Sequence, residues 1–319
     1  MKRLIPKEYL PPSLWNDEDS ILFLPPQLVA SWEMLLDKNN LRERATKRAP
    51  RGFTGGRNKK DTDDHLAWRF TGSAARVMLP ILDPKEDLKE ISNTFARIFS
   101  GNKVFIADLP CGSGATSMSI LSVLCELRKQ SLLPRMPLDV VIVGGDISEY
   151  ALHYAKEALE SLRKELAIQA ITVEFDAVEW DVLDQFSNSK LVKHLTLASQ
   201  HCSTKLLVLA NFSDFLQGDS KWKEARTQFE ELFRHSRGEN SVAIWIEPQK
   251  NNVIGESGFF PRLINWFKGF FISEQIDGDE WNQKNYGKTR TRVKHPLTDG
   301  DFRNHLAVIR FHLPPWKKP

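Results

Sequence analysis

The feature that most constrains the fold is an apolar run that ends in an acidic residue and turns, through two glycines, into a helical pattern. It begins at Val104 and reads VFIADLPCGSGATS, with Asp108 closing the run and Gly112 and Gly114 in the turn. Glycine lets the backbone approach a ligand without a Cβ, and the helix that follows presents free N–H groups and the positive end of its dipole. The segment therefore predicts a strand, a nucleotide-type binding turn and a helix.

Apolar runs and helical patterns alternate along the rest of the chain. Helical periodicity at 117–130, 150–168 and 218–235 separates predicted strands at 104–109, 139–147, 171–180, 205–212 and 241–248. Two more apolar runs, 269–276 and 305–313, have no convincing helix between them, so we expect an antiparallel hairpin at the end of the sheet. The predicted fold class is α/β: a Rossmann-like, seven-stranded, mostly parallel sheet with an antiparallel last strand and helices on both faces.

Residues 1–100 do not continue this alternation, because prolines interrupt short helical pieces. We therefore predict an N-terminal extension or cap, helical or irregular, at 1–100 and a cofactor-binding sheet domain at 101–319. Within the extension, the segment 38–60 carries nine Lys or Arg residues and one acidic residue. A second basic segment, 284–294, carries five Lys or Arg residues and no acidic one.

Composition and charge exclude several classes of protein. The chain is 41% hydrophobic and 27% charged, as ordered globular proteins are, and no apolar run approaches the roughly 20 residues of a membrane helix. Its three cysteines lack Cys-x-x-Cys spacing, which argues against a disulfide framework or a zinc knuckle. The N-terminus shows no secretory signal. We expect a cytoplasmic protein with no membrane partner, and nothing in the sequence requires a metal.

The residues at the predicted strand ends resemble those of class I S-adenosylmethionine-dependent methyltransferases, over roughly residues 100–313. The first motif of that family, an acidic residue followed by Gly-x-Gly-x-Gly, corresponds to the stretch from Asp108 to Gly114, with Pro110 in place of the first glycine. Proline fixes φ and removes one N–H, so the turn keeps its shape with one donor fewer. Asp146, at the end of the second strand, corresponds to the acid that binds both ribose hydroxyls, which suit the two oxygens of a carboxylate.

The resemblance assigns further residues to the cofactor, S-adenosyl-L-methionine, and to the reaction. Asp181 corresponds to the acid near the adenine amino group. Asn211 and Asp214, after the fourth strand, face the methyl donor and the acceptor, and we predict them as catalytic because holding a nucleophile in line is mostly a matter of orientation. The complete set of predicted cofactor-binding residues is Asp108, Pro110, Cys111, Gly112, Gly114, Asp146, Ile147, Asp181, Val182 and Asn211.

The two basic segments are the best indication of the acceptor. Both mix cations with glycine and an aromatic residue, Phe53 in one and Tyr286 in the other, which suits phosphate contact and base stacking. We therefore expect methyl transfer to RNA or another nucleic acid, although solvated surface charge is the default explanation for such segments. The predicted substrate-binding residues are Arg48, Arg51, Arg57, Trp68, Arg69, Arg290 and Arg292.

Other interpretations stay open. The acceptor can instead be a protein or a small molecule, or the chain can be a non-catalytic binding or assembly factor with a protein partner. An NAD-dependent oxidoreductase is disfavoured because Ser117 stands where the third glycine or alanine is expected and because the chain ends in an antiparallel hairpin, although Asp146 suits either cofactor. Asp146 and Asp181 can instead be helix caps, Asn211 and Asp214 can instead be turn formers, and Glu247 is a further candidate base.

Overall fold

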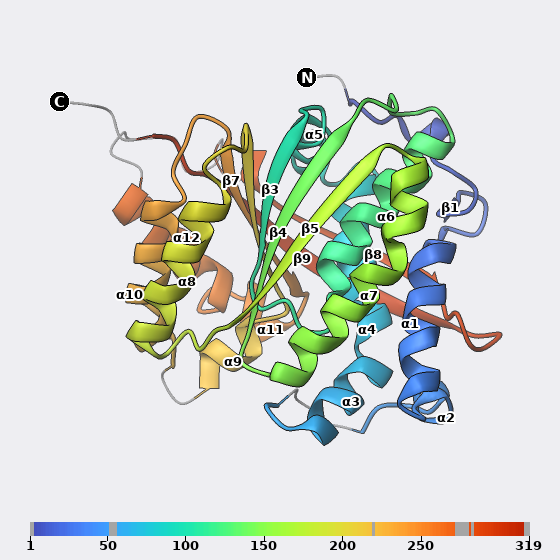
Figure 1. Ribbon diagram of the computed structural model, residues 1–319, viewed down its shortest axis with the longest axis horizontal. Coiled ribbons are helices and arrows are strands. Elements are labelled where there is room, and N and C mark those ends of the chain that lie inside the picture. The colour runs from blue at the N-terminus through green and yellow to red at the C-terminus, as the bar shows by residue number, and fades with distance from the viewer. Residues whose placement is uncertain (1–2, 51–55, 219–220, 272–280, 282–283, 316–319) are drawn as a thin grey trace.

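One mixed sheet with helices on both sides forms the centre of the molecule (Figure 1). The computed structural model describes residues 3–50, 56–218, 221–271, 281 and 284–315. Within them the strand order is β1-β2-β8-β9-β7-β6-β3-β4-β5. The parallel strands are β3 (Lys103–Asp108), β4 (Leu138–Asp146), β5 (Ile171–Glu179), β6 (Thr204–Ala210) and β7 (Ser241–Pro248).

The order of these parallel strands places a reversal between β3 and β6. From β3 the chain moves outward through β4 to β5, then returns to the other side of β3 and continues through β6 to β7. This is the arrangement of doubly wound sheets, which bind ligands at the carboxyl ends of the strands where the order reverses. All five predicted strands of this part are confirmed.

The sheet has nine strands among the described residues rather than the predicted seven. The additional two are β1 (Trp15–Asn16) and β2 (Ile21–Leu22), which pair with each other antiparallel. β2 also pairs in parallel with β8 (Tyr286–Lys294) and so extends one edge of the sheet. Each has two residues, too few for any alternation of hydrophobic and polar residues to show in the sequence.

The last two described strands along the chain form an antiparallel hairpin, but its first strand is not the predicted one. β8 pairs antiparallel with β9 (Asp301–His312), which in turn lies antiparallel to β7. The predicted strand at 269–276 is wrong at its start, because α12 (Phe259–Phe271) includes residues 269–271; residues 272–276 lie outside the described part. The basic segment 284–294 instead supplies the strand, with Thr289, Thr291 and Val293 buried and the cations between them exposed.

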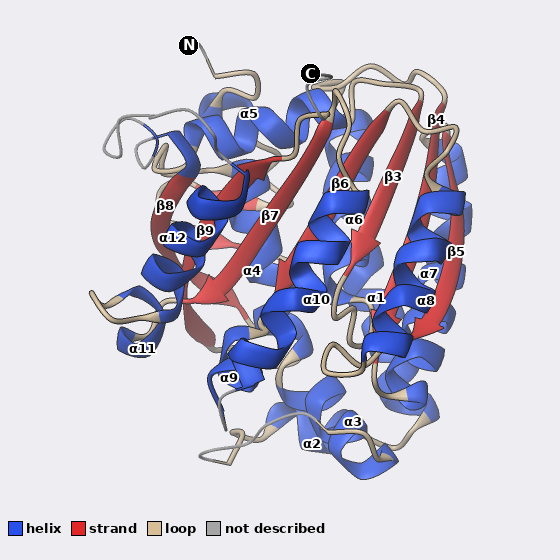
Figure 2. Ribbon diagram, turned by 90° about the vertical axis from the view of Figure 1, so that its left-hand side faces the viewer, coloured by secondary structure: helices blue, strands red, loops and turns tan. Residues whose placement is uncertain are grey.

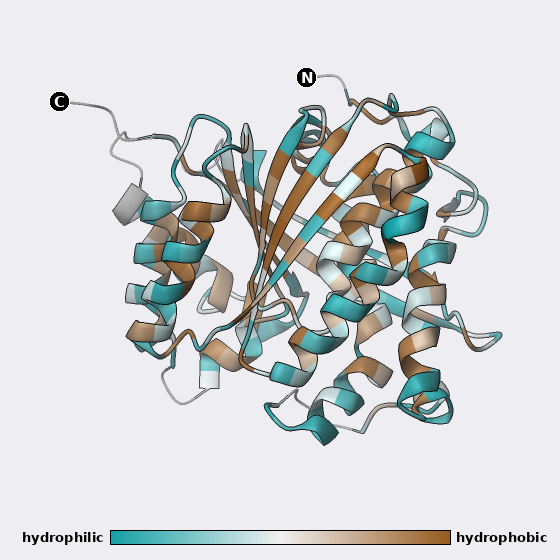
Figure 3. Cartoon of the chain, viewed as in Figure 1, coloured by the Kyte–Doolittle hydropathy of each residue, from teal (hydrophilic) through white to brown (hydrophobic). Residues whose placement is uncertain are grey.

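The two faces of the sheet carry separate hydrophobic cores. Val104 and Ile106 belong to one core, whereas Phe105 and Ala107 belong to the other, because side chains alternate along a strand. In Figure 3 the strands are mostly hydrophobic and many outer helix surfaces are hydrophilic. One face is covered by α1 (Pro26–Lys38), α4 (Phe70–Leu82), α6 (Ala115–Lys129) and α7 (Glu149–Ile168), and the other by α8 (Gln185–Ala198), α10 (Lys221–His235) and α12.

Helices from before and after β3 lie at the carboxyl ends of the parallel strands. Figure 2 shows α2 (Arg42–Thr46), α3 (Lys59–Trp68) and α9 (Ser213–Gln217) at the end toward which the parallel strands point. α4 contacts α6, β7 and β9, and α3 contacts α7. The boundary near residue 100 stays a prediction. The remaining helical elements described are η1 (Lys7–Tyr9), α5 (Lys89–Ile98) and α11 (Asn251–Ile254). In the described part of the chain, every helix is too short or too polar to cross a bilayer.

Candidate functional site

The turn between β3 and α6 needs both of its glycines. Gly112 has φ +51° and Gly114 has φ +84°, in the left-handed region that L side chains rarely adopt. A Cβ on Gly114 would lie 3.1 Å from the Cα of Ala155, so α6 begins against α7. The nearest atom to a Cβ on Gly112 would be Cε1 of His65, at 4.0 Å. The backbone at Gly112 is therefore open on the side that faces the N-terminal helices.

The carboxylate of Asp146 ties this turn to the end of β4. Gly112 N–H donates to Oδ2 of Asp146 and Ser148 N–H donates to Oδ1, each at 2.9 Å. Each oxygen keeps a further lone pair, so the carboxylate can still accept two hydroxyl groups. Burial raises the pKa of Asp146, and the backbone N–H groups lower it. The cap of α7 is Ser148, whose Oγ accepts from Ala151 N–H, and Asp146 is left for another role.

Asp108 places a second carboxylate at the first turn of α6. The side chain is fully buried, and its Oδ2 accepts from the backbone N–H (3.1 Å) and the hydroxyl (2.7 Å) of Ser117. Oδ1 of Asp108 and Oγ of Ser113 are buried without a hydrogen bond of normal length from any described residue. Burial raises the pKa of Asp108 to about 7, against the lowering effect of Ser117 and, more weakly, of the Thr116 hydroxyl.

Glu247 fixes the loop that carries Asn211. Its Oε1 accepts from the N–H groups of Phe212 and Ser213 (both 2.9 Å) and from Nε1 of Trp245 (2.7 Å), and its Oε2 accepts from the Ser213 hydroxyl (2.8 Å). Burial raises the pKa of Glu247 to about 6. Because these bonds all hold the loop, Glu247 is a positioning residue; Asn211, with φ +59°, follows β6 directly.

Arg76 is a site residue to which the sequence assigns no specific contact. It extends from α4, and its Nε donates to Oδ1 of Asn211 at 2.6 Å. Its Nη1 lies 3.4 Å from Oδ1 of Asn304 on β9. Among the described residues, no carboxylate oxygen lies within 4.0 Å of the guanidinium, and burial lowers its pKa to about 10. The mostly enclosed guanidinium of Arg76 thus faces Asn211 after β6 and Asn304 on β9. Arg76 and Asn211 are 135 residues apart in the sequence, so only the tertiary fold brings them together.

His65 and Arg69 lie beside this cation. Burial, together with the charges of Arg69 and Arg76, lowers the pKa of His65 to about 4, so the imidazole is neutral at neutral pH. Arg69 is the residue between α3 and α4. His65 thus faces the β3–α6 turn, and Arg76 faces Asn211.

The other predicted cofactor and catalytic residues are more peripheral. Asp181 follows β5 and pairs with Arg57 at 2.5 Å, while its Oδ1 accepts from Leu183 N–H. Asp214 is half exposed in the first turn of α9 and forms an ion pair with Lys250. Val182 is buried in the core, Ile147 and Pro110 are half-buried, and Cys111 is buried with its thiol pKa raised by burial.

The predicted substrate residues do not form one group. Arg57 pairs with Asp181 near β5, Arg290 and Arg292 are exposed on β8, and Arg48 is exposed after α2. Nε1 of Trp68 donates to the carbonyl of Arg44 at 2.8 Å, and its ring packs against the core. Arg51 lies outside the described residues. The two basic segments therefore reach the carboxyl edge from opposite ends of the sheet.

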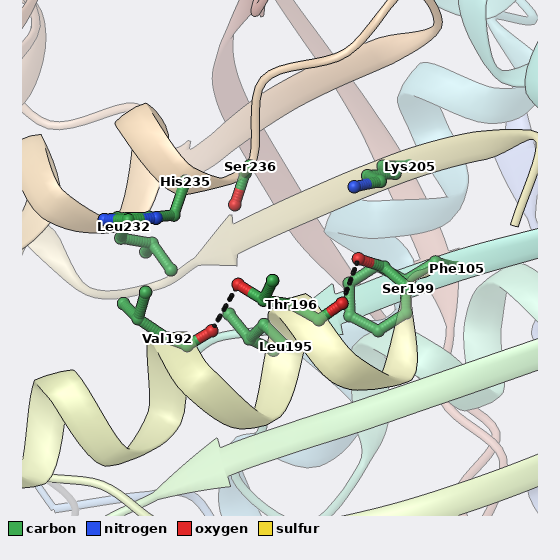
Figure 4. A pocket seen from close by; sticks show the side chains of 9 residues that line it. All are labelled: Phe105, Val192, Leu195, Thr196, Ser199, Lys205, Leu232, His235 and Ser236. Carbon is green, nitrogen blue, oxygen red and sulfur yellow. Dashed lines mark hydrogen bonds between the residues drawn. The ribbon is translucent and has the colours of Figure 1, made fainter. Parts of the chain in front are cut away.

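A small cavity between α8, α10 and β3 lies apart from these residues (Figure 4). Its lining includes Phe105, Thr196 and Ser236, and Oγ1 of Thr196 donates to the Val192 carbonyl. The volume is about 10 Å³, room for at most one water molecule. This cavity is too small for a cofactor.

Comparisons with known proteins give only distant likenesses. No family model matches the chain, and a search of curated proteins found no match. Among solved structures, TehB from Haemophilus influenzae is similar over 73% of this chain and 66% of its own, with 14% identity and a TM-score of 0.35. The methyltransferase domain of bacterial CtHen1-C is similar over 69% of this chain and 96% of its own (12%, TM-score 0.30).

A third similar structure is a candidate S-adenosyl-L-methionine-dependent methyltransferase from Methanococcus maripaludis. The likeness covers 83% of this chain and 99% of that one, with 14% identity and a TM-score of 0.33. At such TM-scores none of these likenesses carries an argument about function. What the site can do rests on its own geometry.

Proposed function

We propose that this chain is an S-adenosylmethionine-dependent methyltransferase whose cofactor lies along the β3–α6 turn. The observation that carries the proposal is the buried carboxylate of Asp108 at the first turn of α6. Dinucleotide-binding folds place a pyrophosphate against the free N–H groups of this helix end. Here the Ser117 N–H already donates to Asp108, and an ionised Asp108 repels a phosphate. A ligand with a cationic end and no phosphate suits the position better.

The atoms around the turn fit such a ligand. Oδ1 of Asp108, which lacks a hydrogen-bond partner among the described residues, can accept from the methionine ammonium group, and the backbone at Gly112 leaves space on the side that faces His65. Asp146 can accept from two ribose hydroxyls through its remaining lone pairs. Asp181 is then the acid on the adenine side, with Arg57 as its partner in the free protein. When bound, S-adenosylmethionine supplies a methyl group on a positively charged sulfur, which is the electrophile.

The residues at the end of β6 orient the acceptor. Asn211 is held in its left-handed conformation by the loop that Glu247 anchors, and Arg76 fixes the amide through its Oδ1. The Asn211 NH₂ group is then turned away from Arg76 and can position a nucleophilic nitrogen or oxygen. Asp214, engaged with Lys250 at the surface, is the weaker of the two predicted catalytic residues.

We propose a nucleic acid, RNA in the first instance, as the acceptor. Support comes from cations at the strand ends that have no carboxylate within 4.0 Å among the described residues: Arg76 in the site, and Lys288 and Arg290 exposed on β8. A protein or small-molecule acceptor, or loss of turnover, remains an outcome of the test. Radiolabelled S-adenosylmethionine is incubated with the protein and either total RNA or total protein of a cell.

The proposal predicts label in the RNA fraction, lost on Asp146→Ala and retained by Asp139→Ala. Asp139 is a suitable control because it is exposed at the opposite end of β4. Label in the protein fraction alone would reassign the acceptor. Cofactor binding without label in either fraction would indicate a binding factor rather than an enzyme.

A further inference from the structure

A polar cavity of about 260 Å³ opens beside the β8–β9 hairpin, at the end of β7. Its lining consists of Asp87, Gln249, Lys288, Thr289, Arg290 and His305. Asp87 is the only acidic residue of this set, and its carboxylate accepts from the Thr289 hydroxyl at 2.7 Å. The cations of the cavity are therefore available to a ligand.

The strand register gathers positive charge on this face of the hairpin. Arg290 lies opposite His305, and Arg292 lies opposite Arg303. Like charges directly opposite on paired strands destabilise a sheet, so Arg292 and Arg303 call for a compensating anion. Arg292 has one, Asp301 at 3.2 Å. Among the described residues, no carboxylate lies within 4.0 Å of the side-chain nitrogens of Lys288, Arg290 or Arg303.

The cavity adjoins the candidate active site. Gln249, just after β7, donates its N–H to the carbonyl of His305 at 3.1 Å. The neighbouring Asn304 contacts Arg76, which in turn holds Asn211. Figure 2 shows α11, the helix that follows Gln249, at the carboxyl end of the parallel strands. The cavity and Arg76 therefore lie at neighbouring positions of β9, at the same end of the sheet.

An aromatic surface lies on the other side of the same strand ends. Phe215 on α9 is 37% exposed and stacks on Phe212, the residue after Asn211, with ring centroids 5.3 Å apart. Nζ of Lys221 lies 4.4 Å from the Phe215 centroid. Exposed aromatic rings among cations are the surfaces on which proteins stack the bases of single strands.

We propose that the cavity beside Lys288 and Arg290 binds backbone phosphates of a single-stranded nucleic acid whose base is methylated at Asn211. This inference rests on the proposed function and names the acceptor's binding surface. Alternate residues of a strand are about 6.8 Å apart, a spacing of the same order as that of successive phosphates in an extended single strand. Lys288 and Arg290 thus contact neighbouring phosphates, whereas Arg292 is held by Asp301 and by the carbonyl of Asp19.

The test measures binding of a short fluorescein-labelled single-stranded RNA of mixed sequence by anisotropy, over salt concentrations from about 50 to 200 mM. Lys288→Gln, Arg290→Gln and the double variant are compared with Lys164→Gln, a change of an exposed lysine on α7. For single strands, the logarithm of the association constant falls with the logarithm of the salt concentration, and each phosphate contact adds about 0.7 to the steepness of this fall. Near 0.15 M salt, one such contact therefore raises the affinity about fourfold. We expect Lys288→Gln and Arg290→Gln each to lose one such contact, and the double variant to bind the RNA about 14-fold more weakly than the Lys164→Gln control.

The outcomes separate this inference from the proposed function. Each variant is also titrated with S-adenosylmethionine, whose affinity we expect to stay unchanged because neither side chain contacts the β3–α6 turn. If the wild-type protein binds the cofactor but the double variant binds RNA as tightly as Lys164→Gln does, the cavity inference is wrong. Weakened binding of a polyglutamate peptide with unchanged RNA binding would assign the surface to an acidic protein and also overturn it. Failure of the wild type to bind the cofactor contradicts the proposed function instead.

Discussion

Replacement of Asp108 by asparagine is expected to change stability and cofactor binding in opposite directions. Burial raises the pKa of Asp108 from 3.8 to about 7 in the folded chain. A group whose pKa is higher in the folded state stabilises the fold below its unfolded pKa, and this contribution is lost as the pH rises through the folded pKa. The difference of about 3 pKa units corresponds to about 4 kcal/mol lost between pH 4 and pH 8.

Asp108→Asn removes this dependence because the amide does not titrate. Its oxygen can still accept from the Ser117 N–H and hydroxyl. Between pH 4 and pH 8 we expect the variant to gain about 4 kcal/mol in free energy of unfolding relative to wild type, measured by urea denaturation at each pH. The matched control is Asp139→Asn, at an exposed position on β4, for which we expect no such gain.

Cofactor affinity should behave in the opposite way. If the ammonium group of S-adenosylmethionine pairs with ionised Asp108, wild-type affinity rises with pH up to about 7, by as much as about 100-fold from pH 5 to pH 8. The Asp108→Asn protein should bind more weakly at pH 8 and lack this part of the pH dependence in calorimetric titrations. A variant that binds as tightly as wild type at pH 8 with the same pH dependence would refute the assignment of Asp108 to the cofactor.

Three further substitutions test the geometry of the site. Gly114→Ala should lower the free energy of unfolding by about 1–2 kcal/mol or more, because φ is +84° and the new Cβ would lie 3.1 Å from the Cα of Ala155. Gly269→Ala in α12 should lower it by nothing, because the space around that position is open, and urea denaturation compares the two variants. Glu247→Ala leaves three buried N–H donors without an acceptor and should lower the free energy of unfolding by about 3 kcal/mol or more; a loss below about 1 kcal/mol would contradict the anchoring role. Arg76→Lys should slow methyl transfer about 10- to 100-fold with unchanged cofactor affinity, unlike Arg163→Lys on the surface, and unaltered turnover would exclude Arg76 from orienting Asn211.

The parallel core was predictable because its signals are local. Each central strand is an apolar run bounded by polar residues, and the strand from Val104 to Asp108 leads into glycines whose positive φ the turn requires. The hairpin was harder, because β8 carries alternate cations that resemble a basic loop. The sequence signal for this strand was the alternation of basic residues with the β-branched residues Thr289, Thr291 and Val293, which are buried in the structure. β1 and β2 have two residues each and gave no recognisable strand pattern in the sequence.

The site was only partly predictable for a related reason. Asp108, Gly112 and Asp146 each follow a strand, so their approach to one another could be inferred from the alternation of strands and helices. Arg76 lies in an apolar helix far from Asn211 in sequence, and only the tertiary fold joins them. Similarly, Glu247 reads as a candidate base until its four hydrogen-bond donors are known.

A calorimetric titration of the protein with S-adenosylmethionine and with NAD shows directly which cofactor the β3–α6 turn binds. We predict saturable binding of S-adenosylmethionine, weakened by Asp146→Ala and not by Asp139→Ala, and no binding of NAD at the same concentrations. The ribose contacts depend on Asp146, and the carboxylate of Asp108 opposes a pyrophosphate. Three results would contradict S-adenosylmethionine as the cofactor of this site: binding of NAD, absence of S-adenosylmethionine binding, or S-adenosylmethionine binding that Asp146→Ala leaves unchanged.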